Sequence, residues 1–157
     1  MKGNEKVIAS LNDLLSDELT AINQYIVHAE MAANWGYPVL HDSAEKRAID
    51  EMRHAEMHIA RILFLEGRPI VSNLREVFIG EDVPKMYEND HMSERGAIQK
   101  YNAAIKLCQE MGDNGTKEML DGILQDEEGH IDYIEAQQDK IAQMGLSMYL
   151  TTLTKKE

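Results

Sequence analysis

The chain has 157 residues, which suffice for one domain with a continuous core but not for two domains of ordinary size. Its 28 acidic residues against 16 basic ones give a net charge of −12, which repels nucleic acid and anionic membranes and favours cations. The single cysteine, Cys108, cannot form an internal disulfide, and no apolar run reaches membrane-spanning length. We therefore expect a single cytoplasmic domain over residues 1–157 that binds neither nucleic acid nor a membrane.

Good helix formers dominate the composition and only three prolines interrupt it, so we expect an all-α chain. Asn4 and Asp82 are N-cap candidates that precede apolar residues at helical spacing. Trp35-Gly36-Tyr37-Pro38 and Gly67-Arg68-Pro69 each interrupt such a pattern. The expected helices span about residues 4–34, 40–66, 82–111 and 116–144, with a short fifth helix over about 146–153.

The lengths of the connections predict how these helices are arranged. Short links after the first and third helices make their neighbours antiparallel. The 15 residues from 67 to 81 show no helical period, and a coil of that length spans about 50 Å. The second helix is only roughly 40 Å long, so this segment can return along it. We therefore expect an antiparallel four-helix bundle in which a long crossover makes the second and third helices parallel.

The chain also contains an internal repeat of a two-helix unit. The expected topology relates the two units by an approximate twofold axis, so equivalent residues should face each other. A shift of 76 positions pairs Glu18 with Glu94, Tyr25 with Tyr101, Asp50 with Asp126, Glu51 with Glu127, and His54 with His130.

The repeated residues have the types and spacing of a metal site. In each Glu-x-x-His pair the side chains lie about 60° apart around the helix, so both can reach one ion. Four carboxylates buried together without metal would repel one another, whereas two divalent ions would cancel their charge. A single Glu-x-x-His match often lies on a solvated face, but two matches and two further glutamates at one offset favour a site. The expected ligands are Glu18, Glu51, His54, Glu94, Glu127 and His130.

One Glu on each of two helices, with Glu-x-x-His on the other two, is the arrangement found in di-iron and di-manganese carboxylate bundles. Mixed oxygen and imidazole ligands suit redox-active iron, so we expect two iron ions in each chain. Tyr25 and Tyr101 lie seven residues after Glu18 and Glu94, on the same helix faces. Their hydroxyls can reach the glutamates opposite, although a plain core role is equally compatible, and Tyr25 is a candidate redox residue.

With these residues in hand, the chain closely resembles the bacterioferritin family over nearly its whole length. The resemblance implies a ferritin-like topology and a hollow shell of 24 subunits built from dimers. It also implies iron storage and detoxification, in which Glu51 and Glu127 bridge the irons of a ferroxidase centre that uses O2 or H2O2. The matching stretches are MKGNEKVI, DELTAINQY, IDEMRHAE, RILFLEGRP, IGEDV and DEEGHIDYIE.

The resemblance further implies that Met52 supplies one of two sulfur ligands to a b-type haem shared between two subunits. A bacterioferritin-associated ferredoxin would pass electrons to the stored mineral and release iron. One helical step turns Met52 about 100° away from the irons. Taken alone, one of ten methionines is more typical of packing. The outer apolar face expected beside Met52 consists of Leu19, Ile22, Asn23, Ile26, Ile49 and Ile59.

Three positions depart from the pattern of the family. Lys46 stands where many relatives carry a histidine that, with the residue matching Asp50, binds iron on the inner wall of the shell. His58 stands where relatives often carry tyrosine, and Tyr133 where some carry tryptophan. We therefore do not transfer an inner-wall iron site or an electron path through these positions.

Other helical iron proteins fit less well. A rubrerythrin-like peroxidase normally needs two Cys-x-x-Cys pairs, which one cysteine excludes. A ribonucleotide-reductase-type subunit needs a much larger chain, and a mini-ferritin places its iron between subunits. A haem-bearing shell whose inner site binds metal without turnover remains an alternative.

Overall fold

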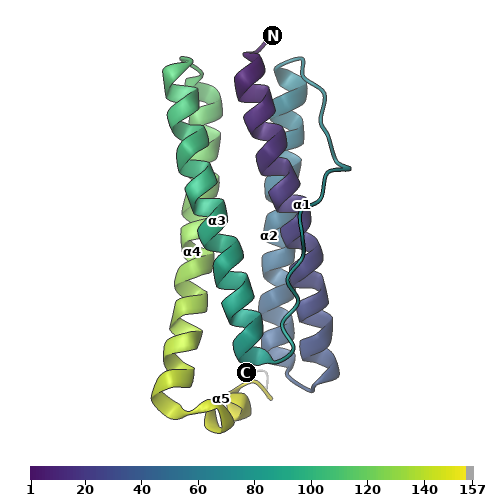
Figure 1. Cartoon of the computed structure of the whole chain (residues 1–157), viewed down its shortest axis with the longest axis vertical. Helices are drawn as coiled ribbons and strands as arrows, with labels where there is room; N and C mark the ends of the chain where they lie inside the picture. The colour runs from purple at the N-terminus through teal and green to yellow at the C-terminus, as the bar shows by residue number, and fades with distance from the viewer. Residues whose placement is uncertain (155–157) are drawn as a thin grey trace.

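The computed structural model describes residues 1–154, which form five helices and no strand (Figure 1). The expected all-α bundle with a short C-terminal helix is confirmed. Residues 155–157 of the expected domain lie outside the described residues. Within residues 1–154, no helix combines the length and apolarity needed to cross a membrane. The helices are α1 (Glu5–Asn34), α2 (Pro38–Phe64), α3 (Val83–Glu110), α4 (Asn114–Met144) and α5 (Leu146–Thr152).

The helix starts follow local chemistry. Asn4 caps α1 by accepting from the Lys6 backbone N–H at 2.8 Å, and Asp82 caps α3 by accepting from that of Lys85 at 2.8 Å. Two helices begin two residues earlier than expected. Pro38 opens α2 instead of preceding it, because proline fits the first helical turn, where its missing N–H is not needed. Asp113 caps α4, so that helix begins at Asn114.

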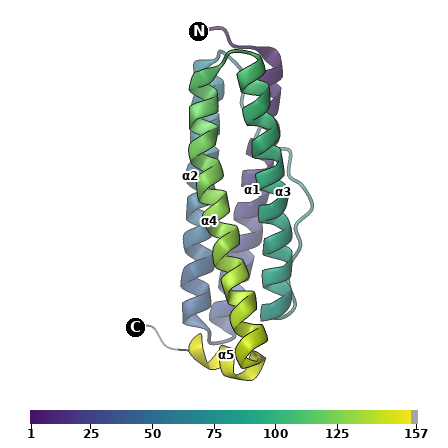
Figure 2. The same cartoon turned by 90° about the vertical axis from the view of Figure 1, so that its left-hand side faces the viewer.

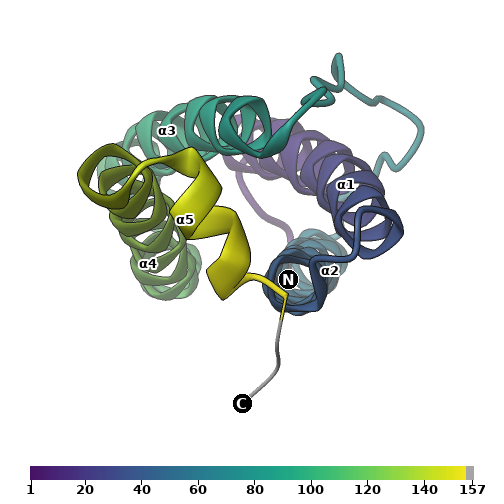
Figure 3. The same cartoon turned by 90° about the horizontal axis from the view of Figure 1, so that it is seen from below.

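The helices form two pairs, α1 with α2 and α3 with α4, as the view along the bundle shows (Figure 3). The two helices of each pair run in opposite directions (Figure 1). The long connection between α2 and α3 runs along the outside of α1, so α2 and α3 are parallel (Figures 1 and 2). At the end of the bundle α5 crosses beneath it, where the Val39 backbone N–H donates to the Leu153 carbonyl at 3.2 Å.

Polar side chains of α1 hold the crossing segment in place. The Ile70 N–H donates to Asn12 Oδ1 at 2.8 Å, and the Phe78 N–H donates to Gln24 Oε1 at 3.1 Å. Thr20 Oγ1 also accepts from a backbone N–H of this segment, whereas the Ser16 hydroxyl donates to a backbone carbonyl. The four side chains recur every fourth residue, which places them in one row on the helix. The backbone of this irregular segment thus finds the partners that a regular element would supply.

Two apolar clusters fill the bundle, one toward each end. The first joins the start of α1 to the end of α2 and includes Leu11, Ile62 and Leu120. The second includes Tyr87 and Tyr149, whose hydroxyls lie 2.8 Å apart and dock α5 onto the bundle. Between these clusters the buried side chains are largely polar. The candidate site lies in this middle layer.

The close approach of Gly80 to α3 gives a stability prediction. A Cβ at Gly80 would lie 2.3 Å from the Met86 backbone nitrogen, so Gly80→Ala should lower the free energy of unfolding by about 1–3 kcal/mol. Gly122 in α4 is the matched control, since a Cβ added there would meet no neighbouring group within 4 Å. Gly122→Ala should raise the free energy of unfolding by up to about 1 kcal/mol. Equal urea midpoints for the two variants would contradict this packing.

Candidate metal centre

All six ligands expected from the sequence meet in the middle layer of the bundle. Each of the four long helices contributes, so the site is held by the packing of the whole bundle rather than by one loop. His130 keeps 13% of its side chain exposed, whereas the side chains of the other five residues are at most 4% exposed. These residues form two groups that could hold a metal ion: Glu18, Glu51, His54 and Glu127, and Glu51, Glu94, Glu127 and His130.

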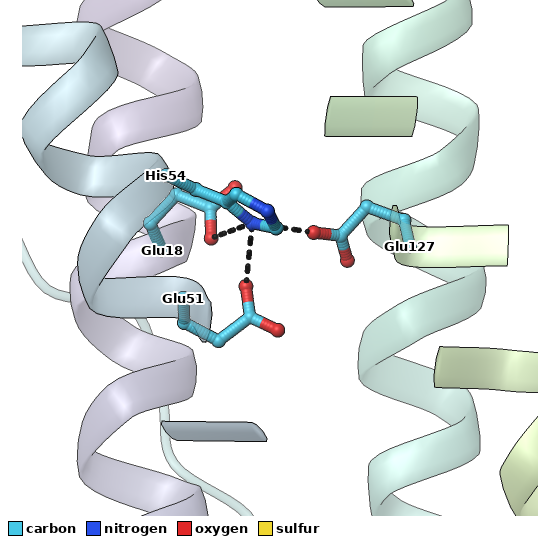
Figure 4. Close-up of side chains that lie close together, drawn as sticks. All are labelled: Glu18, Glu51, His54 and Glu127. Carbon is cyan, nitrogen blue, oxygen red and sulfur yellow. Dashed lines mark ion pairs between the residues drawn. The ribbon is translucent and has the colours of Figure 1, made fainter. Parts of the chain in front are cut away.

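In the first group, the His54 imidazole points at three carboxylates (Figure 4). Its Nδ1 lies 3.0 Å from Glu127 Oε1, 3.4 Å from Glu51 Oε2 and 3.7 Å from Glu18 Oε2. Because Glu51 and His54 are three residues apart on α2, both side chains emerge on one helix face. Glu18 and Glu127 reach the same space from α1 and α4.

The second group mirrors the first. His130 Nδ1 lies 3.0 Å from Glu51 Oε1, 3.6 Å from Glu94 Oε2 and 3.9 Å from Glu127 Oε2. Glu51 and Glu127 therefore belong to both groups, and in each group the ligand atoms lie within 4.8 Å of one another. The arrangement offers two adjoining positions that share two carboxylates.

The inward-facing atoms support the fit of cations to this space. Among residues 1–154, the buried atoms without a hydrogen-bond partner include Glu51 Oε1, Glu127 Oε1, His54 Nδ1 and His130 Nδ1. Buried polar atoms normally have partners, and unpaired ones are costly. Carboxylate oxygens and neutral imidazole nitrogens are ligands for divalent transition metals. Two such ions would satisfy all four atoms.

A second pair of carboxylates lies behind the histidines. Asp126 Oδ2 is 3.1 Å from His54 Nε2, and Asp50 Oδ2 is 3.7 Å from His130 Nε2. A carboxylate on the outer ring nitrogen orients a ligand histidine and directs its other nitrogen inward. Sequence analysis missed this role, although the repeat had already paired Asp50 with Asp126. Lys46 lies 3.3 Å from Asp50 and shares that carboxylate.

The two tyrosines of the repeat bond the glutamates opposite, which confirms the expected contacts. Tyr25 Oη donates to Glu94 Oε1 at 2.5 Å, and Tyr101 Oη donates to Glu18 Oε1. Both phenols are buried, and burial raises the pKa of each well above its ordinary value. They therefore remain neutral donors that restrict the orientation of the two unshared glutamates.

Burial also makes the centre retain protons. Desolvation, followed by the charge of Glu51, raises the pKa of the Glu18 and Glu127 carboxyls well above their ordinary value. Burial alone would lower the pKa of His130, but the nearby Glu51 and Glu94 carboxylates stabilise its protonated form and raise that pKa to about 10. At neutral pH, protons therefore occupy the positions that cations would take.

Two cavities reach the centre from opposite sides. One of about 680 Å³ lies between α2 and α4 and is lined by both histidines and by Asp50 and Asp126. The other, of about 270 Å³, lies between α1, α3 and the crossing segment. All four glutamates of the site line the second cavity. Small ions and molecules can thus approach the carboxylates and the histidines separately.

Comparison with known proteins agrees with this arrangement. A family model described as the ferritin-like domain matches residues 8–144. A bacterioferritin of Brucella melitensis is 40% identical over 149 residues, which cover 95% of this chain and 92% of that protein. The bacterioferritin of Rhodobacter capsulatus is 40% identical over 151 residues, covering 94% of each chain. This chain belongs to the bacterioferritin family.

In this bacterioferritin-family chain, Met52 lies on the outer side of α2, away from the centre. Met52 is 45% exposed, and Ile49 and Ile26, two residues of the expected outer apolar face, are 41% and 49% exposed. An exposed thioether beside apolar side chains fits a flat apolar group such as haem. The outer apolar face is smaller than expected, because three of its residues pack partly against the core. These residues are Leu19, Ile22 and Ile59.

The protons held in the centre give a pH prediction. Metal binding requires a neutral His130, whose pKa is raised to about 10, so a divalent ion must displace a proton at pH 7. Zn(II) titrated calorimetrically in two buffers of different ionisation enthalpy should therefore release protons. As the pH rises from 7 toward 10, the affinity should increase and the number of released protons should fall. Binding that is independent of pH would contradict this protonation pattern.

Proposed function

We propose that this protein stores iron and oxidises Fe(II) to Fe(III), with O2 or H2O2 as the electron acceptor. The observation that carries the proposal is the pair of adjoining positions with shared buried carboxylates whose inward atoms have no other partner. Relatives named bacterioferritin, at about 40% identity over nearly the whole chain, support it. The proposed site consists of Glu18, Glu51, His54, Glu94, Glu127 and His130.

The proposed roles follow from the two groups. Glu18 and His54 would hold one Fe(II), and Glu94 and His130 would hold the other, while Glu51 and Glu127 would contact both. Two divalent ions carry four positive charges, which balance the four carboxylates and remove their mutual repulsion. Two Fe(II) substrates side by side can supply two electrons to one acceptor. With H2O2, those electrons and two protons give two molecules of water.

Tyr25 and the cavities complete the proposed site. Tyr25 would hold Glu94 in its ligand orientation through the 2.5 Å bond, and it is also our candidate redox residue. Fe(II) would enter through the cavity beside α1 and α3, because all four glutamates of the site line it.

We further propose that the protein assembles into a 24-subunit shell built from dimers, with Met52 from each of two subunits ligating a shared b-type haem. The exposed apolar residues around Met52 support a partner on this face of α2. Bound haem would supply one-electron transfer. The proposed electron donor is a small ferredoxin, and the proposed outcome is reductive release of stored iron.

The number of bound ions tests the proposed centre. Because the chain offers two adjoining positions, anaerobic titration should show saturable binding of two Fe(II) per subunit, followed by rapid oxidation when the acceptor is added. His130→Ala should abolish rapid oxidation, as measured by stopped-flow absorbance. Glu128→Ala changes an exposed acid beside Glu127 and should leave the rate unchanged.

Two results would count against the proposal. Saturation at one Fe(II) per subunit would show that the two groups do not act as two positions. Parental oxidation rates in His130→Ala, Glu18→Ala and Glu94→Ala would remove these residues from the site. Binding of two ions without turnover would instead support the alternative of a shell that only holds metal.

The haem proposal has its own test. Met52→Leu keeps the size and apolarity of the side chain but removes the sulfur, so the purified variant should lose haem and release iron more slowly. Its ferroxidase rate should be unchanged, because Met52 faces away from the centre. Met57→Leu is the control, since Met57 is also on α2 and is 40% exposed. A parental haem spectrum in Met52→Leu would make Met52 a packing residue.

A further inference from the structure

The two halves of the centre share ligands but not surroundings. The repeat that pairs the glutamates, histidines and tyrosines does not extend to the two buried α2 residues that lie against those tyrosines. Arg47 corresponds to Ile123, and His58 corresponds to Ile134, and all four side chains are at most 4% exposed. The approximate twofold symmetry of the ligands is therefore broken by the residues directly behind them.

Arg47 stands behind the Glu94 half. Its guanidinium carbon lies 4.8 Å from the centroid of the Tyr25 ring, and Tyr25 donates to Glu94. A guanidinium is always charged in proteins, so this buried side chain is a fixed cation. Neither Nη atom of Arg47 has a hydrogen-bond partner, and its nearest carboxylate oxygen, Asp90 Oδ2, is 3.5 Å from Nη1. Asp90 therefore compensates this charge only partly.

The Asp90 carboxylate also accepts hydrogen bonds from other side chains. Its Oδ1 accepts from Gln24 Nε2 at 2.9 Å and lies 2.8 Å from His28 Nδ1. His28 Nε2 accepts from the Gly80 N–H at 2.9 Å, so His28 is the neutral tautomer with its proton on Nδ1. This polar network has no counterpart in the other half. At the 76-residue shift, Asp90 corresponds to Leu14, Gln24 to Lys100, His28 to Ala104 and Arg47 to Ile123. Leu14, Ala104 and Ile123 belong to the first apolar cluster.

The Glu18 half has a neutral group in the comparable place. His58 Nε2 lies 2.7 Å from Tyr101 Oη, with the ring centroids 5.8 Å apart. Because Tyr101 gives its proton to Glu18, His58 Nε2 must donate to the phenol oxygen. The buried Nδ1 of His58 has no partner, which favours its unprotonated form.

We propose that the two metal positions are inequivalent: the Glu18–His54 position fills first, and Arg47 weakens the Glu94–His130 position. The inference rests on the proposed metal centre and goes beyond it. A fixed cation behind Tyr25 repels a divalent ion at Glu94, and the low dielectric of the interior strengthens that repulsion. The greater exposure of His130, 13% against 3% for His54, leaves the same position more open to solvent exchange.

Variants that retain only one of the two metal positions test the inequivalence, because a single bound ion is not repelled by a second one. His130→Ala retains the Glu18–His54 position, and His54→Ala retains the Glu94–His130 position. Anaerobic titration with Co(II), followed by its visible absorption, should show that the ion in His130→Ala binds about tenfold more tightly than the ion in His54→Ala. Two positions of equal affinity would overturn the proposal and leave the proposed ferroxidase centre intact. No Co(II) binding by the unsubstituted protein would defeat the proposed centre itself.

Charge substitutions test whether Arg47 is the cause. In the His54→Ala background, Arg47→Gln should tighten Co(II) binding about tenfold, Arg47→Lys should change it little, and Asp90→Asn should weaken it. In the His130→Ala background, Arg47→Gln should change the affinity less than about twofold, because the guanidinium faces the other half. Arg61→Gln is the control: Arg61 is also on α2 but pairs with Asp113, at 2.9 Å, near the end of the bundle.

The signs of these changes decide the outcome. Opposite effects of Arg47→Gln and Asp90→Asn on the Glu94–His130 position would establish that charge controls it. Equal weakening by Arg47→Gln, Arg47→Lys and Asp90→Asn would show that Arg47 only supports packing, and would overturn the proposal. If Arg47→Gln does not fold, Arg47→Lys and Asp90→Asn still distinguish the two explanations, because the charge explanation expects little change from the first and weaker binding from the second, whereas a packing role expects both to weaken binding. Circular dichroism identifies a variant that has not folded.

Discussion

Four carboxylates buried at one level of a helical bundle are the constraint on which the rest of this structure depends. Desolvation and mutual repulsion oppose their ionised forms, so protons or cations must accompany them. The apolar clusters on either side supply the packing that holds the four helices together around this unfavourable layer. The centre can therefore keep its geometry without metal despite this repulsion. That is the condition for taking up and releasing metal ions.

Hydrogen bonds and ion pairs from neighbouring side chains fix the orientation of the ligands. Two tyrosines bond the unshared glutamates, and two aspartates lie against the outer nitrogens of the histidines. Each ligand is thus oriented by a second side chain, as preorganised metal sites require. The row of polar residues on α1 adds a further level of support, because it fastens the crossing segment that lines one of the two cavities.

The repeat gives the centre nearly equivalent ligands, but the surrounding core does not follow the same symmetry. A polar network containing Arg47 and Asp90 lies behind one half, and the corresponding positions in the other half are mostly apolar. Two metal positions with different affinities would suit a protein that takes up iron and passes it on. In such a centre one ion could be held while the other exchanges through the more open side near His130.

The sequence by itself determined the helices, their topology and the six candidate ligands. Caps, helical periodicity and connection lengths are local properties, and the 76-residue offset exposed the paired ligands directly. Only the tertiary structure decided what lies behind those ligands. The partnership of Arg47 with Tyr25 and Asp90 joins three helices, and no spacing along the chain encodes such a contact. Likewise, Asp50 and Asp126 were visible as a repeated pair, but their place against the opposite histidines depends on how α2 and α4 pack.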